Sequence, residues 1–142
     1  MPALRLAATP PPMSASFNVF LVEDHPAMRE AYAAVLAQEP DIGVCGVVES
    51  AEQALDALDG LPCDLVVTDL RLPGMSGVDL VQRLRMMRPD LPALVISAHE
   101  EEVYAERARE AGAVGFLPKQ GLAGTLVPTI REVLEAASNR PR

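Results

Sequence analysis

Residues 66–77 of this chain read VVTDLRLPGMSG, and this stretch is the most informative about the fold. Its first three residues belong to a short run of β-branched and aliphatic residues, Leu65–Thr68. Such a run is typical of a strand that helices cover on both faces. The run ends at Asp69, and a turn follows in which Gly74 and Gly77 are expected to serve backbone conformation. A helix is predicted after Gly77. The stretch is therefore a strand–turn–helix unit with a carboxylate at the end of its strand.

Four further apolar runs of the same kind lie on either side of it in the sequence. They alternate with longer amphipathic segments, which is the pattern of βα units around a parallel sheet. Together these runs predict an α/β fold, a single doubly wound (βα)5 flavodoxin-like sandwich with a five-stranded parallel sheet. The strands are predicted at Asn18–Val22, Gly43–Val48, Leu65–Thr68, Ala93–Ser97 and Gly115–Pro118.

Local signals mark the ends of the helices. Pro26 is a favoured residue in a first turn, and Ser50 with Gln53 forms a capping-box pattern for the second helix. The fourth helix is expected from near Glu100 to Gly112, and the last is expected to run to about Ala137. The third helix is expected to end before Pro89. The residues predicted to face the core are Met28, Ala31, Tyr32, Val35 and Leu36 in the first helix, Val78, Val81 and Leu84 in the third, and Leu126, Ile130, Val133 and Leu134 in the last.

The 142 residues suit one domain with a full core, predicted at residues 17–137. Residues 1–16 contain little that could be buried and are expected to be a disordered leader, and residues 138–142 a C-terminal tail or linker. Neither a signal peptide nor a bilayer-spanning run is evident, so a cytoplasmic protein is expected. Cys45 and Cys63 lack metal-ligand spacing and are expected to be small buried hydrophobes in a reducing compartment.

The chain is acidic, with a formal net charge of −8. A protein that binds nucleic acid needs basic surface to neutralise phosphates, so direct binding of nucleic acid by these residues is not expected.

Polar residues stand where the predicted strands end. Glu23 and Asp24 follow the first strand, Asp69 the third, Ser97 ends the fourth, and Lys119 follows the fifth. The carboxyl ends of parallel strands meet at one edge of the sheet, where ligands bind in this class of fold. Clustered carboxylates repel one another unless a cation joins them, and an oxygen-lined pocket suits Mg²⁺. An Asp carboxylate beside Mg²⁺ and a lysine can accept a phosphoryl group as an acyl phosphate.

Four motifs in order, EDHP at 23–26, VVTDLRLPGMSG at 66–77, LVISAH at 94–99 and GFLPK at 115–119, resemble the receiver domain of two-component response regulators. The resemblance covers about residues 17–137. It is strongest to receivers that precede LuxR-type helix-turn-helix output domains, although no such domain is present here.

The resemblance implies that Asp69 accepts a phosphoryl group from a sensor histidine kinase. Asp24 and Asp69 would bind Mg²⁺ (or Mn²⁺) directly, together with the main-chain carbonyl of Arg71, and Glu23 would act through a bound water. Lys119 would contact the phosphoryl group. No other cofactor and no membrane partner is expected, and the chain would be a phosphoacceptor that promotes its own phosphotransfer and dephosphorylation rather than a metabolic enzyme.

The resemblance also implies a switch. Ser97 would move toward the phosphoryl group, and Phe116 would turn inward behind it. The face made by the fourth helix, fifth strand and fifth helix would then change shape and control an output. This output would be transcription through an absent DNA-binding domain, or a contact with another protein if the chain is a stand-alone receiver. A homodimer could form through this face. Independently of the resemblance, we expect Val103, Tyr104 and the exposed side of the last helix to form the dimer or output contact.

Other readings stay open at single residues. Glu23 and Asp24 could merely cap the first helix, and Phe116 could be an ordinary core aromatic. An Asp-nucleophile phosphatase would need a second Asp two residues after Asp69, where Arg71 stands, and a pseudo-receiver would not need the intact acidic set.

The two histidines, His25 and His99, lack ligand spacing and are not expected to be metal ligands or phosphohistidines. We instead hypothesise that Arg71 and His99 lie at the pocket mouth and tune the access of water to the acyl phosphate.

Overall fold

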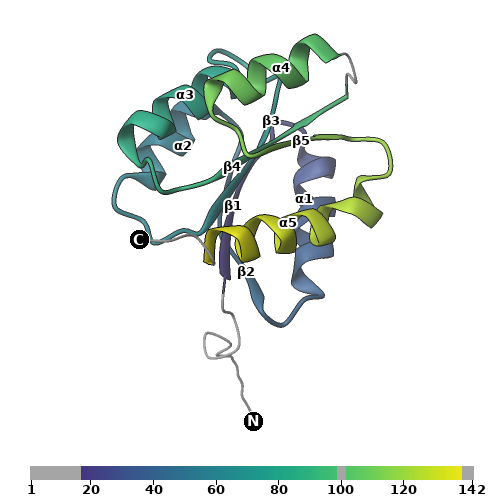
Figure 1. Cartoon of the computed structure of the whole chain (residues 1–142). Coiled ribbons are helices and arrows are strands. Elements are labelled where there is room, and N and C mark those ends of the chain that lie inside the picture. Colours follow the sequence, from purple (N-terminus) through teal and green to yellow (C-terminus); the bar gives the residue numbers. More distant parts are fainter. Residues whose placement is uncertain (1–16, 99–101, 139–142) are drawn as a thin grey trace.

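The computed structural model describes residues 17–98 and 102–138, which form a five-stranded parallel sheet between two layers of helices (Figure 1). The strand order is β2-β1-β3-β4-β5, so the predicted doubly wound fold is confirmed. The elements are β1 (Phe17–Val22), α1 (Pro26–Ala37), β2 (Ile42–Val48), α2 (Ala51–Leu58), β3 (Leu65–Asp69), α3 (Gly77–Met87), β4 (Ala93–Ser97), α4 (Glu102–Ala111), β5 (Gly115–Pro118) and α5 (Leu122–Ser138).

Each face of the sheet has its own hydrophobic core. On one face Phe20 of β1 and Val66 of β3 pack with residues of α2, α3 and α4. On the other face Leu21 of β1 and Val67 of β3 pack with α1 and α5. Because neighbouring side chains of a strand point to opposite faces, both must be apolar, which explains the continuous apolar runs of β3 and β4.

The helix signals are mostly confirmed. Pro26 opens α1, and the Ser50 hydroxyl accepts a hydrogen bond of 3.1 Å from the main-chain N–H of Gln53. The Gln53 side chain in turn accepts one from the main-chain N–H of Glu49 at 2.9 Å. The predicted start of the fourth helix near Glu100 lies outside the described residues, as do the predicted leader and nearly all of the predicted tail.

Several burial predictions need correction. Ala31 was expected in the core but is exposed, and Met28 and Val35 are only half-buried, so the buried stripe of α1 is narrow and centred on Tyr32 and Leu36. A narrow stripe is enough here because α1 packs mainly against β2, an edge strand of the sheet.

Cys45 and Cys63 were also expected to be buried, but both are half-buried free thiols. Within the described residues, no helix is long and apolar enough to cross a membrane.

The topology positions the functional edge. The chain leaves β1 for β2 on one side and returns to β3 on the other, so the crossovers diverge at the carboxyl ends of β1 and β3. Ligand sites of doubly wound sheets lie at this switch point.

Candidate functional site

A hollow of about 240 Å³ lies at the carboxyl end of the sheet. The structure brings together there the strand-end residues that the sequence singled out, with Arg71 at its wall. The hollow is lined by Asp24, His25, Asp69, Arg71, Leu72, Ser97, Ala98 and Lys119. Glu23 lies beneath the hollow and is only 1% exposed. Its carboxylate forms an ion pair with Lys119, one of the lining residues.

Asp69 and Lys119 form the central pair of this site. Lys119 Nζ donates a hydrogen bond of 3.0 Å to Asp69 Oδ2, and the carboxylate is 5% exposed. Burial raises the pKa of Asp69, and the negative charge of Glu23 adds to this, so that the bond from Lys119 does not fully compensate. Burial opposes the charge of Lys119, yet Asp69 and Glu23 outweigh it and raise the pKa of the ammonium. Lys119 is therefore charged, in a site with excess negative charge.

Main-chain contacts hold this pair in place. The Lys119 N–H donates to the carbonyl of Ser97 at 2.8 Å, and the Leu70 N–H donates to the carbonyl of Ile96 at 2.7 Å. The side chains at the ends of β3, β4 and β5 are thus fixed by the sheet ladder itself, which gives a rigid arrangement.

Glu23 is held from two sides. Its Oε2 accepts a hydrogen bond of 3.2 Å from the main-chain N–H of His25 and lies 3.0 Å from His25 Nδ1, while its Oε1 lies 3.2 Å from Lys119 Nζ. Burial would raise the pKa of this carboxyl, but the contacts with His25 and the charge of Lys119 outweigh it and lower the pKa. Glu23 is therefore an anion inside the protein.

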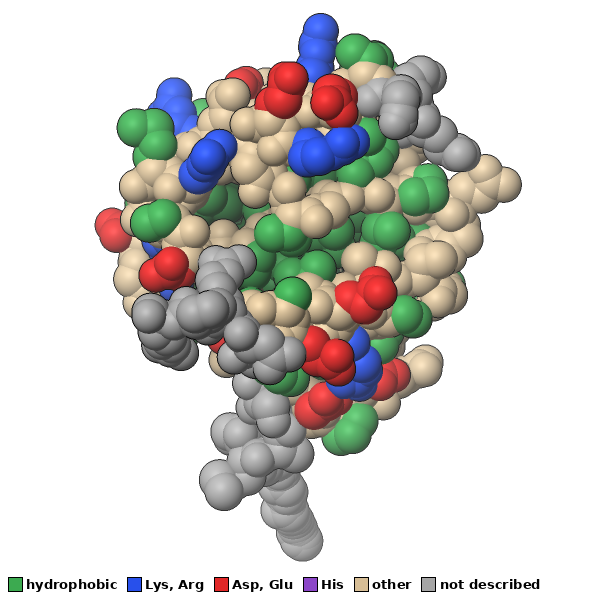
Figure 2. Space-filling view, viewed as in Figure 1, with side chains coloured by type: hydrophobic (Ala, Val, Ile, Leu, Met, Phe, Trp, Pro, Cys, Tyr) green, Lys and Arg blue, Asp and Glu red, His purple; other side chains and the backbone are tan. Residues whose placement is uncertain are grey.

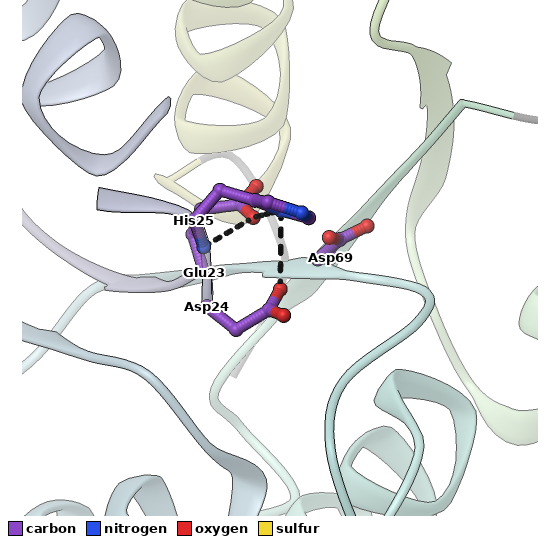
Figure 3. A group of neighbouring side chains, drawn as sticks. All are labelled: Glu23, Asp24, His25 and Asp69. Carbon is purple, nitrogen blue, oxygen red and sulfur yellow. Dashed lines mark hydrogen bonds and ion pairs between the residues drawn. The ribbon is translucent and has the colours of Figure 1, made fainter. Parts of the chain in front are cut away.

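Oxygens at this edge remain without a hydrogen bond. They include the buried Glu23 Oε1 and Asp24 Oδ1, which belong to the acidic group, and the phenol oxygen of Tyr32 on α1. Buried carboxylate oxygens without partners are costly unless a cation binds them. One ligand atom each from Glu23, Asp24, His25 and Asp69 lies within 4.8 Å of all the others (Figure 3). The oxygens of this group fit a hard divalent cation such as Mg²⁺.

Arg71 turns its side chain toward α4. Its Nη2 donates a hydrogen bond of 3.2 Å to the hydroxyl of Tyr104, and its Cζ lies 5.7 Å from the centroid of that ring. This contact joins the loop after Asp69 to α4. His99, the other residue in the rate-tuning hypothesis, lies outside the described residues.

The two residues of the expected switch lie on neighbouring strands. Ser97 ends β4 and is 1% exposed, at the floor of the hollow. Phe116 of β5 pairs with Val95 of β4 and is half-buried against the core that α2, α3 and α4 cover. Both an inward-facing switch aromatic and an ordinary core residue are compatible with this position.

Three neighbours of the site were not assigned to it from the sequence: His25 had been rejected as a ligand, Tyr32 was expected only in the core, and Gly77 was expected only to serve backbone conformation. His25 faces the carboxylates, Tyr32 lies below them, and Gly77 packs against the main chain of Asp69. Burial, with the charges of Glu23 and Asp69, raises the pKa of the Tyr32 phenol. The position of His25 directly after two acidic residues was the one signal in the sequence that could have indicated its place.

Comparisons with known proteins agree with this architecture. The family model of the response regulator receiver domain matches residues 19–131. The chain is 28% identical over 121 residues to the transcriptional regulatory protein DegU of Brevibacillus brevis, covering 85% of this chain and 51% of DegU. The chain spans about half the length of the curated relatives it matches.

Solved structures show the same likeness. The signal receiver domain of a response regulator from Mycobacterium tuberculosis superposes with a TM-score of 0.78 and 28% identity, covering 89% of this chain and 99% of that domain. A two-component response regulator of the LuxR family from Aurantimonas sp. SI85-9A1 gives a TM-score of 0.82 and 30% identity, with 86% of this chain and 87% of that one covered. The resemblance to receivers of the LuxR class is thereby confirmed.

Proposed function

Because the chain belongs to the response regulator receiver domain family of two-component systems, we propose that Asp69 accepts a phosphoryl group from a sensor histidine kinase in a reaction that requires Mg²⁺. One observation carries this proposal. The buried Asp69 carboxylate lies 3.0 Å from Lys119 Nζ, next to buried oxygens of Glu23 and Asp24 that accept no hydrogen bond. Because receiver domains interact with sensor histidine kinases, a kinase of this class is the proposed upstream partner.

Asp24 and Asp69 would hold the metal directly, with the main-chain carbonyl of Arg71, and Glu23 would act through a bound water. When bound, a divalent ion offsets the charge on a transferring phosphoryl group. Glu23 and Asp24 supply this site with negative charge that Lys119 alone leaves partly uncompensated.

In this proposal, the chain's own residues accept the phosphoryl group and position it. Lys119 binds Asp69 Oδ2, which leaves Oδ1 to form the new bond to phosphorus while the phosphorus–nitrogen bond of the donor phosphohistidine breaks and its imidazole leaves. Lys119 then provides a compact positive charge for a phosphoryl oxygen. The Ser97 hydroxyl can donate a further hydrogen bond to the same group.

The proposed output is a change at the face formed by α4, β5 and α5. Figure 2 shows hydrophobic side chains in the region between α4 and α5, where β5 forms the edge of the sheet. Val103 on α4 is 52% exposed, and Val114 lies exposed just before β5. A phosphoryl group that attracts Ser97 would favour the conformation with Phe116 inward, because it contacts that state better.

The names of the relatives support a proposal about what this face controls. Because relatives such as DegU are transcriptional regulatory proteins, we infer that this receiver regulates transcription through a DNA-binding output domain in the cytoplasm, or acts by protein contact as a stand-alone receiver. A homodimer through the same face would serve either role.

Intact-protein mass after incubation with acetyl phosphate tests the proposal. One added phosphoryl group is expected on the wild type in the presence of Mg²⁺, none without Mg²⁺, and none on Asp69→Asn. Asp90→Asn, which changes an exposed carboxylate outside the hollow, is the control and should be labelled like the wild type. Failure of both acetyl phosphate and beryllofluoride to form an adduct would overturn the proposal, and steady turnover of a phosphate ester would favour a phosphatase.

A further inference from the structure

The imidazole of His25 is part of the acidic group, although its sequence spacing argued against a metal ligand. Its Nδ1 lies 3.0 Å from Glu23 Oε2 and 3.4 Å from Asp24 Oδ1, and Figure 3 shows the ring directed at both carboxylates. The side chain is 65% exposed. A nitrogen donor therefore stands at the rim of a pocket whose other candidate ligands are oxygens.

Buried atoms of the same group point to a cation. Glu23 is 1% exposed, and its Oε1 accepts no hydrogen bond although Lys119 Nζ is 3.2 Å away. Asp24 Oδ1 is likewise buried without a hydrogen bond. The lysine ammonium thus leaves these carboxylate oxygens without a hydrogen bond, and one ligand atom each of Glu23, Asp24, His25 and Asp69 lies within 4.8 Å of the others.

The mixed donor set matters for the type of ion. Mg²⁺ prefers oxygen ligands and gains little from an imidazole, whereas Zn²⁺, Ni²⁺ and Cu²⁺ bind imidazole readily. Donors around an ion with bonds of about 2.0–2.2 Å are separated by roughly 2.8–4.4 Å. The distances of 3.0 and 3.4 Å from His25 Nδ1 to the two carboxylates lie within that range.

We propose that His25 makes this pocket a nitrogen–oxygen site that takes a divalent transition ion of the zinc class, in competition with Mg²⁺. The inference rests on the proposed function, since the carboxylates of Asp24 and Asp69 are shared by both ions. An ion held by His25 and these carboxylates occupies the acceptor Asp69 and lowers its phosphorylation. His25 is then the residue that determines which class of metal the pocket prefers.

Calorimetric titration of the metal-free protein with Zn²⁺ alone and with Mg²⁺ alone tests this directly. The titrations use a Cys45→Ala, Cys63→Ala background, because the two free thiols could also bind Zn²⁺, and circular dichroism checks the fold of each variant. His25→Ala is expected to lower the ratio of Zn²⁺ affinity to Mg²⁺ affinity about tenfold or more. A ratio that stays unchanged would overturn the proposal, because a merely structural role of His25 weakens both ions alike.

Electron paramagnetic resonance can identify which histidine supplies the nitrogen ligand. The chain has two histidines, so imidazole coupling in the electron paramagnetic resonance spectrum of bound Cu²⁺ can be assigned with two variants. The coupling should vanish in His25→Ala and persist in His99→Ala; the reverse result contradicts the inference. Asp24→Asn should weaken Zn²⁺ binding as well, and unchanged affinity there would place the ion elsewhere.

These readouts do not depend on phosphorylation. If acetyl phosphate labels Asp69 with Mg²⁺ while the metal ratio is unaffected by His25→Ala, only the present inference fails. If no adduct forms but the His25-dependent Zn²⁺ binding is found, the proposed phosphoacceptor function fails alone.

Discussion

Gly77 packs directly against the main chain of Asp69. A Cβ atom at position 77 would collide with the carbonyl oxygen of Asp69, and the Gly77 N–H donates a hydrogen bond of 2.9 Å to the carbonyl of Leu70. The first residue of α3 therefore holds the end of β3 in place. Space, rather than an unusual backbone angle, requires glycine here, because Gly77 is not among the glycines with positive φ.

Gly77→Ala should accordingly be strongly destabilising. The backbone of Asp69 cannot move aside without breaking the ladder of β3, so we expect a loss of about 2–4 kcal/mol in the free energy of unfolding. Gly124→Ala is the matched control, since nothing lies near its added methyl group, and in α5 it should be neutral or stabilising by up to about 1 kcal/mol. Urea unfolding of both variants measures the difference; equal stability of the two would contradict the packing argument.

Asp69→Asn should stabilise the metal-free protein. Burial raises the pKa of Asp69, so the unfolded state ionises more easily than the folded state, and stability is lost as the pH rises through the folded pKa. An uncharged amide removes this loss, and we expect a gain of about 1 kcal/mol at pH 7. The gain should shrink on acidification, because Asp69 of the wild type then becomes protonated in both the folded and the unfolded state. Thermal unfolding with a chelator present measures it, and a variant less stable than the wild type at pH 7 would refute the argument.

The contact between Arg71 and Tyr104 should affect the lifetime of the acyl phosphate. It fixes the guanidinium at the wall of the hollow, on the side of α4. We expect Arg71→Ala and Tyr104→Leu each to change the rate of dephosphorylation by about threefold, and the double variant to change it no further, because residues in contact are not additive. Decay of the labelled protein followed by mass spectrometry measures the rates.

Tyr104→Phe is the conservative control for this pair, because it keeps the ring beneath the guanidinium and removes only the hydroxyl acceptor. Its effect should be smaller than that of Tyr104→Leu. Unchanged rates in Arg71→Ala and in His99→Ala would end the hypothesis that these residues tune access of water.

The ion pairs of Arg131 should make stability depend on pH. Arg131 of α5 binds Asp41 through both oxygens, at 2.6 and 2.9 Å, and Glu39 at 2.7 Å. The hydrogen bonds from Arg131 lower the pKa of Asp41 below its ordinary value of 3.8. A lowered pKa contributes stability above the unfolded pKa, and this contribution is lost as the pH falls through the folded pKa.

Arg131→Gln should therefore lower the melting temperature modestly at pH 7, with a difference from the wild type that disappears under strongly acidic conditions. Arg109→Gln, which removes an exposed pair with Glu106 inside α4, should have a smaller effect. A difference that persisted unchanged at low pH would exclude the Asp41 carboxylate as its source.

The order of the elements and the edge at which the chemistry lies could both be predicted from the sequence. Continuous apolar runs such as Leu65–Thr68 can be buried on both faces only in a sheet between helices, and a parallel sheet puts Asp24, Asp69 and Lys119 at one edge whatever the details of packing. Such local patterns need no knowledge of distant contacts, which is why the strands were predicted to within one residue at each end.

How those side chains meet depends on long-range packing that no local pattern contains. Lys119 reaches Asp69 across a separation of 50 residues, and the distance depends on the register of β3, β4 and β5. The turn of His25 toward Glu23, the contact of Arg71 with Tyr104 and the close packing of Gly77 on Asp69 depend likewise on side-chain directions and on the space between elements. The spacing of apolar residues in a sequence predicts which side chains are buried, but only the assembled fold sets the distances between them.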